Sequence, residues 1–151
     1  MLLDDAATIL AHADFFEICD NEQRRLLAFA SEKRLHVSGA IVSKGGEVPG
    51  GAHILVTGVL QITYEGGEGR GQDVSEPGTV IGLMALVLNK PRPLTVRALS
   101  AAETLYIPRT AFLKLAQQSP DLAQRAADRI RSELTRYLSA IDPMRGRFGE
   151  G

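Results

Sequence analysis

The sequence contains a single cysteine, carries almost no net charge and has no long hydrophobic run, and each of these shortages excludes a class of protein. Cys19 cannot form an internal disulfide, which favours a reducing, cytoplasmic setting. The formal net charge of −1 gives the chain no overall attraction for DNA or RNA. No apolar stretch is long enough to cross a membrane, and the acidic start at Asp4 and Asp5 is unlike a signal peptide. We therefore expect a cytoplasmic protein that contacts neither a membrane nor nucleic acid directly.

Residue patterns for catalysis and metal binding are also missing. His12, His36 and His53 are scattered without the spacing of paired ligands, so we expect no metal site. No Gly-x-Ser-x-Gly motif is present, and the glycine-rich stretch 65–71 lacks the terminal Gly-Lys-Ser/Thr of a phosphate loop, so we predict a mobile turn there. An enzyme on a cupin-like jelly roll would need clustered histidine ligands. We therefore expect no enzymatic activity.

The chain has the length and composition of one ordinary domain. Of its 151 residues 44% are hydrophobic and 23% are charged, which suffices for a hydrophobic core. Apolar residues recur at helical spacing from residue 2 to 30, and Asp20 or Asn21 is placed to cap the second of two helices. Helical spacing returns from 109 to 141, with one break at Ser119-Pro120, where proline is tolerated as a helix start.

Short apolar or alternating runs, separated by glycine-containing turns, fill the middle of the chain. The predicted strands are 35–37, 40–42, 53–56, 59–64, 72–74, 94–98 and 104–107. Many short strands at such spacing predict a closed barrel or jelly roll. We therefore predict an α+β, mainly β fold, with N-terminal helices over 3–32, a barrel over 33–108 and C-terminal helices over 109–141. These parts form a single domain, 1–141, and residues 142–151 are expected to form a flexible tail.

The segment 81–98 is the strongest candidate for a binding site. Ile81 ends a predicted strand, Gly82 makes a tight turn, and one or two turns of helix follow. Unpaired backbone N–H groups at a helix start attract anions. Arg92 would return to the same place, where its guanidinium binds phosphate oxygens as a fork. The spacing therefore predicts a small anion site.

The order of these features resembles the cyclic-nucleotide-binding fold over roughly residues 10–138. The matching segments are Asp14-Phe15-Phe16, Ser38-Gly39-Ala40-Ile41-Val42, Gly45-Gly46-Glu47, the hairpin 53–60 and the run 77–82 into the phosphate-binding cassette. From Ile81 to Ala98 the family cassette aligns without a gap. The family includes catabolite-activator-like regulators and protein kinase A regulatory subunits. The resemblance therefore implies a regulatory module that takes a cyclic nucleotide or another phosphate-bearing ligand, with no other cofactor.

The resemblance implies roles where residues match. Gly82 would let the backbone approach the ligand, because it lacks a Cβ. Three backbone N–H groups would face a cyclic phosphate, those of Met84, Ala85 and Leu86. Arg92 would pair with the phosphate charge, and Thr95 stands where some members contact the base.

One position departs from the family pattern. In the family a glutamate directly after the cassette glycine accepts a hydrogen bond from the ribose 2′-hydroxyl, and here that residue is Leu83. A hydrogen bond to a charged group contributes about 1.5–3 kcal/mol, so affinity for cyclic AMP or cyclic GMP is expected to be roughly ten- to a hundredfold lower. Leu94 also replaces a smaller residue and is expected to narrow the pocket. Leu83 either belongs to the core and pocket lining or selects a less polar ligand.

The last predicted helix carries an apolar stripe. Its members are Leu122, Ala126, Ile130, Leu134, Leu138 and Ile141. In the resembling regulators this helix covers the ligand or pairs with a second copy, and packing on its own barrel is a third option. Arg129, Arg131 and Arg136 alternate with Asp128 and Glu133, which predicts a mixed solvated face. Few residues follow the helix, where bacterial activators continue into a helix-turn-helix, so we expect no direct reading of DNA.

Two functions therefore remain open from the sequence. The first is a small-molecule-sensing module that binds an anion or cyclic nucleotide and repositions its C-terminal helix. The second is a ligand-free, degenerate barrel that forms a homodimer through helix 121–141 or docks another protein.

Overall fold

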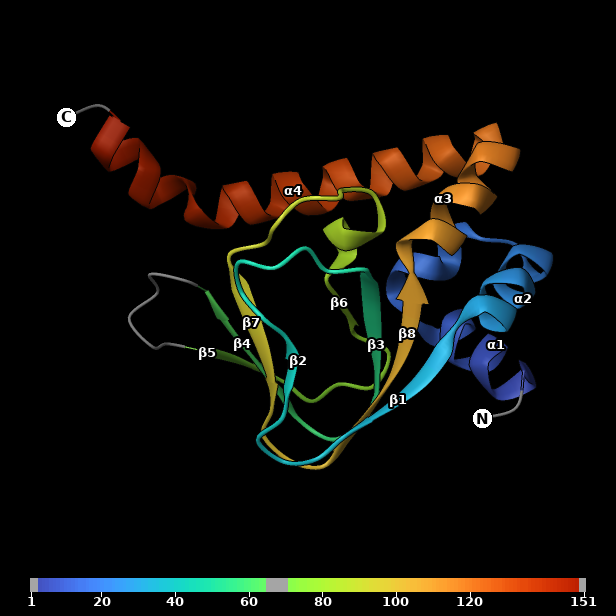
Figure 1. The fold of residues 1–151 in the computed structure, drawn as a ribbon. Coiled ribbons are helices and arrows are strands. Elements are labelled where there is room, and N and C mark those ends of the chain that lie inside the picture. Colours follow the sequence, from blue (N-terminus) through green and yellow to red (C-terminus); the bar gives the residue numbers. More distant parts are fainter. Residues whose placement is uncertain (1–2, 65–70, 150–151) are drawn as a thin grey trace.

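The computed structural model of the chain describes residues 3–64 and 71–149. Most of the turn predicted at 65–71 lies outside these residues. Helices, barrel and helices follow one another as predicted from the sequence, so the α+β jelly-roll architecture is confirmed (Figure 1).

Short elements build this architecture. The N-terminal elements are α1 (Leu3–His12), the 3-10 helix η1 (Asp14–Ile18) and α2 (Asn21–Ala30). The strands are β1 (Glu32–His36), β2 (Ile41–Ser43), β3 (Gly51–Thr57), β4 (Leu60–Tyr64), β5 (Gly71–Val74), β6 (Val80–Ile81), β7 (Leu94–Ala98) and β8 (Ala102–Pro108). The 3-10 helix η2 (Leu83–Leu86) lies between β6 and β7, and α3 (Arg109–Gln118) and α4 (Pro120–Gly149) complete the fold.

The strands form two antiparallel sheets, with the strand orders β1-β8-β3-β6 and β2-β7-β4-β5. Apolar side chains of both sheets meet inside the barrel, where the buried ones are Leu55, Leu60, Val74, Ile81, Val96, Ala98 and Ala102. The outer face of the first sheet packs against the helices, which lie on one side of the barrel (Figure 1). Because side chains alternate along a strand, β3 serves both cores: Ile54 packs with the helices, and Leu55 faces the barrel interior.

The sequence signal for the start of α2 is confirmed and made specific by the structure. Asp20, not Asn21, is the N-cap, and its carboxylate accepts a hydrogen bond from the N–H of Gln23 at 2.7 Å. The Gln23 side chain accepts in return from the N–H of Asp20 at 2.9 Å. This capping box satisfies two N–H groups that would otherwise lack partners at the helix start.

Helix α4 runs along one side of the barrel and ends at Gly149 (Figure 1). The tail expected from residue 142 is therefore helical as far as Gly149. Among the described residues, no helix combines the length and the apolar composition that crossing a membrane requires.

One polar cluster interrupts the barrel interior. His53 of β3 is only 6% exposed, and its Nδ1 lies 3.0 Å from the hydroxyl oxygen of Thr104 on β8. The same hydroxyl lies 2.9 Å from Nε2 of His36 on β1. Burial, reinforced by the positive charges of Arg34 and His36, lowers the pKa of His53 to about 4. The buried ring is therefore neutral at neutral pH.

This cluster predicts a loss of stability in mild acid. His53 has an ordinary pKa of 6.5 in the unfolded chain and binds a proton less readily in the folded protein. The stability that the neutral His53 ring contributes is therefore complete above pH 6.5 and is lost as the pH falls towards 4. The unfolding free energy decreases by up to about 3 kcal/mol over this range. In urea unfolding at pH 7 and pH 4.5, His53→Gln should reduce the pH dependence of the unfolding free energy by about 2 kcal/mol or more.

The matched control is His12→Gln, because His12 is exposed at the end of α1. This control should keep the pH dependence of the parent. The readout is the difference between the two pH values, so a constant destabilisation by the His53 substitution does not affect it. An unchanged difference in His53→Gln would contradict the assignment.

Candidate functional site

A cleft of approximately 460 Å³ lies between the cassette, strand β4 and helix α4. Its described lining residues are Ile62, Tyr64, Val80, Ile81, Gly82, Leu83, Met84, Arg92, Pro93, Leu94, Ile130 and Leu134. Four of the seven site residues predicted from the sequence are thus brought together here: Gly82, Leu83, Met84 and Arg92. The volume is within the range of small-molecule pockets.

Gly82 turns the chain from β6 into η2. Its backbone is left-handed, with φ 79° and ψ 36°. A Cβ added there would lie 3.7 Å from the carbonyl oxygen of Gly51, an ordinary contact. The conformation rather than lack of space therefore requires glycine, because a side chain in this region costs about 1–2 kcal/mol.

The backbone of Arg92 is fixed, while its side chain has no partner among the described side chains. Its N–H donates to the carbonyl of Glu47 at 3.3 Å, and its carbonyl accepts from the N–H of Gly46 at 2.9 Å. Among the backbone groups and side chains that the structure describes, nothing forms a hydrogen bond or ion pair with the Arg92 guanidinium, which lines the cleft. An unpaired guanidinium beside an apolar cleft can bind a carboxylate or phosphate through two parallel hydrogen bonds.

The other three predicted site residues do not line the cleft. Ala85 and Leu86 are buried in the helix-side core, and the Ala85 N–H donates to the carbonyl of Gly82 at 2.9 Å. The hydroxyl of Thr95 accepts from the N–H of Gly45 at 2.9 Å. Of the residues expected to contact a ligand, Gly82, Leu83, Met84 and Arg92 are therefore the ones that line the same cleft.

Arg109, which the sequence analysis did not single out, clamps the cassette to α3. Its Nη1 donates to the carbonyls of Pro49 at 2.8 Å, Leu88 at 3.1 Å and Ala85 at 3.2 Å. Its Nη2 donates to the side-chain oxygen of Asn89 at 3.0 Å. A cation at the first residue of a helix is unfavourable for the helix dipole. An arginine at this unfavourable position is the sequence signal that could have indicated partners elsewhere in the chain.

Helix α4 forms one wall of the cleft. The stripe predicted on this helix is divided: Leu122 and Ala126 are buried in the domain's own core, and Ile130 is partly buried against it. Ile130 and Leu134 line the cleft, and Leu134 is 46% exposed. The side chains of Leu138 and Ile141 lie outside the described ones. The N-terminal half of the stripe therefore packs on its own domain.

A salt-bridge cluster fixes α4 next to this wall. Arg129 forms ion pairs with Asp14 at 2.9 Å and Glu17 at 2.5 Å, both on η1. Arg125 donates through Nε to the carbonyl of Ile18 at 2.9 Å. These contacts join α4 to the N-terminal helices within two helical turns of the cleft residue Ile130.

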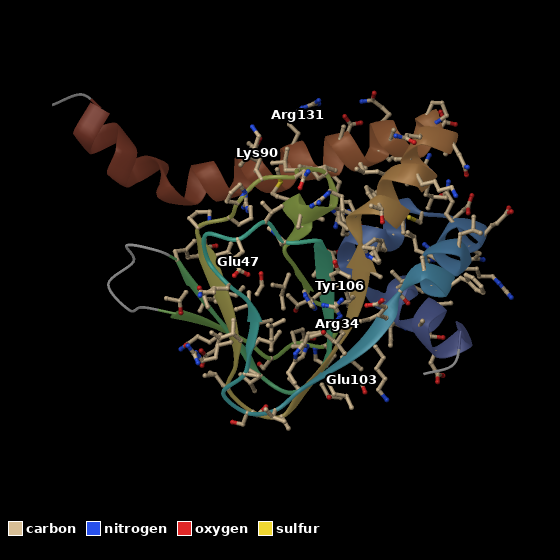
Figure 2. All side chains as sticks on the ribbon, viewed as in Figure 1. Arg34, Glu47, Lys90, Glu103, Tyr106 and Arg131 are labelled. Atoms are coloured by element: carbon tan, nitrogen blue, oxygen red, sulfur yellow. The ribbon has the colours of Figure 1, made fainter. Side chains whose placement is uncertain are left out.

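A second cavity, of approximately 360 Å³, opens between β2 and the first sheet, and the sequence analysis did not predict it. Arg34 stacks on the ring of Tyr106 at 3.8 Å. Figure 2 shows this pair on one side of the opening and Glu47 on the other. Buried His53 also lines this cavity, so its lining is more polar than that of the cassette cleft.

The Arg109 clamp predicts a coupled loss of stability. Arg109→Met keeps much of the apolar stem but leaves part-buried carbonyls of the cassette without a donor. We expect the unfolding free energy in urea to fall by about 2 kcal/mol. Arg131→Met is the matched control, since Arg131 has a 70% exposed side chain and one ion pair with Asp128, and it should change stability by less than about 0.5 kcal/mol. Equal effects of the two substitutions would show that the clamp contributes nothing.

Comparison with known proteins agrees with the fold. The family model of the cyclic nucleotide-binding domain matches residues 34–119, which include the strands, the cassette and Arg109. Among curated proteins none matches the chain. A solved cyclic nucleotide-binding-like protein from Brucella abortus is 34% identical with a TM-score of 0.64, and the alignment covers 76% of this chain and 99% of that one.

Two more distant structures share the fold. The sensor domain of the transcriptional regulator DNR from Pseudomonas aeruginosa is 18% identical with a TM-score of 0.74, over 91% of this chain and 93% of that one. The regulatory domain of Toxoplasma gondii PKA with cAMP is 22% identical with a TM-score of 0.67, over 84% of this chain and 50% of that one. With a family match over more than half of its length, the chain belongs to the cyclic nucleotide-binding domain family.

Proposed function

We propose that the protein is a non-catalytic sensor that binds a small anionic molecule in the cleft between the cassette and α4. The observation that carries this proposal is the guanidinium of Arg92, which lines that cleft and has no partner among the described side chains. A cation that is held by its backbone and paired with no described side chain is available to pair with a ligand anion. The cyclic AMP named with the Toxoplasma structure supports an anionic phosphate ligand as the starting point.

Cyclic AMP and cyclic GMP are proposed to bind weakly. Leu83 lines the cleft at the position where the family has a ribose-binding glutamate. A leucine side chain offers no acceptor, so a ribose hydroxyl buried against it would lose its hydrogen bonds to water without replacement. Pro93, which follows Arg92 in the sequence, carries no backbone N–H, so it also offers no donor to a phosphate.

The proposed output is a change in the position or order of α4. Ile130 and Leu134 belong to this helix and line the cleft, so a bound ligand would contact α4 directly. Arg129 holds the same helix to η1 through Asp14 and Glu17. A ligand shifts such an equilibrium only by its difference in affinity for the two arrangements, and contact with α4 provides that difference.

Calorimetric titration with cyclic AMP tests the anion site. The parent protein should show weak, saturable binding, and Arg92→Gln should weaken it about tenfold or more because a charge-assisted hydrogen bond is lost. Arg131→Gln, at an exposed arginine on α4, should leave the affinity unchanged. Binding that is equally strong in Arg92→Gln would remove the proposal.

Exposure of Leu134 favours one alternative function, dimerisation or docking through the outer half of α4. If this part of the stripe pairs with a second copy, Leu134→Asp should halve the mass measured by light scattering at micromolar concentration. The fold should survive, because Leu134 is 46% exposed. A monomeric parent protein would exclude the homodimer.

A further inference from the structure

The cassette cleft has walls that suit an apolar molecule. Its described lining includes nine aliphatic residues from β4, β6, η2, β7, α4 and the loop before β7, namely Ile62, Val80, Ile81, Leu83, Met84, Pro93, Leu94, Ile130 and Leu134. Arg92 is the one charged side chain among the described lining residues, and Tyr64 adds a phenol. When an apolar ligand covers such walls, apolar surface is removed from water, which favours binding.

The cleft offers few partners to a polar ligand body. The Ala85 N–H is already bonded to the Gly82 carbonyl, and Pro93 has no N–H. A sugar or a base edge placed against Leu83 and Leu94 would leave hydroxyl and amino groups unpaired. One anionic group can be satisfied at Arg92, and the remainder of the ligand meets aliphatic carbon.

The α4 wall points to the same chemistry. Leu134 is 46% exposed, although it lies on the stripe whose earlier members Leu122 and Ala126 are buried in the core. Tyr64, on the opposite wall, is 43% exposed. A ligand with an apolar body would cover both side chains, which the protein itself leaves open to solvent.

We infer that the ligand of this cleft is an anionic amphiphile: a carboxylate or phosphate ester on an aliphatic or aromatic body without ribose-like hydroxyls. The anionic head pairs with Arg92, and the body lies between Leu83, Met84 and Leu134. This inference rests on the proposed function of the same cleft and names its ligand class.

A chain-length series tests the apolar body. We would titrate the purified full chain with hexanoate, octanoate and decanoate in the calorimeter, below their micelle concentrations. Each added methylene should tighten binding about fourfold, as expected for burial of one CH₂ group. Equal affinities for hexanoate and decanoate would overturn the inference.

A comparison of head groups tests the anion. 1-Octanol should bind at least about tenfold more weakly than octanoate, and Arg92→Gln should remove this difference without changing the affinity for 1-octanol. Arg131→Gln should preserve the difference. Octyl phosphate against octanoate then decides which anionic head is preferred, and an Arg92-dependent affinity for either supports the inference.

Substitution of Leu83 tests specificity. Leu83→Glu should weaken octanoate about tenfold or more, because the new carboxylate repels the anionic head and is desolvated by the body. The same substitution should strengthen cyclic AMP about tenfold by restoring an acceptor for the ribose hydroxyl. An unchanged affinity for octanoate would overturn the inference.

The outcomes separate the inference from the proposed function. Cyclic AMP could bind the parent protein more tightly than every amphiphile, with Arg92→Gln abolishing this binding. In that case the proposed sensor function stands, and the inference of an amphiphilic ligand is excluded. If no titrated molecule depends on Arg92, both are excluded.

Discussion

The guanidinium of Arg109 is the contact on which the candidate site depends. The segment between β6 and β7 has only one short 3-10 helix, which leaves several carbonyls without helical partners. Arg109 donates to the carbonyls of Pro49, Ala85 and Leu88 and so joins the cassette, the β2–β3 loop and α3. Because Glu47 of that loop bonds to the backbone of Arg92, the same clamp indirectly sets where the free arginine lies. The positive charge of Arg109 is unfavourable at the start of α3, and the distant carbonyl groups that accept its hydrogen bonds compensate for this.

The barrel interior receives polar and apolar side chains from the same strands. On β3 and β8 the side chains that face inward are His53, Leu55, Thr104 and Tyr106, so one sheet contributes both polar and apolar groups to the interior. Of the polar groups, His53 lies within hydrogen-bond distance of Thr104, and Arg34 lies over the Tyr106 ring. The cassette cleft is instead lined mainly by aliphatic side chains. An anion bound at Arg92 therefore adjoins carbon rather than hydrogen-bonding groups, and this limits the ligands that fit the cleft.

The sequence predicted what short-range signals determine. The cap at Asp20, the glycine turn at Gly82 and the helix break before Pro120 are local, and the structure has all three. Tertiary effects were not predictable: Thr95 bonds to Gly45 from a distant turn, and His53 is buried by its neighbours across two strands. For the same reason the Arg92 side chain could be placed near η2 from its spacing, whereas only the folded chain reveals that no described side chain pairs with it.

The stripe on α4 connects the hydrophobic core with the cleft without interruption. Leu122 and Ala126 stabilise the domain, Ile130 contacts both the core and the cleft, and Leu134 belongs to the cleft wall. A ligand that covers Leu134 extends the apolar surface on which α4 already packs, so it stabilises the docked helix rather than displacing it. The ion pairs from Arg129 to η1 act in the same direction, since they hold the turn that precedes Ile130. An apolar ligand would therefore favour the arrangement of α4 seen in this structure, and loss of the ligand would free the helix beyond Ile130 first.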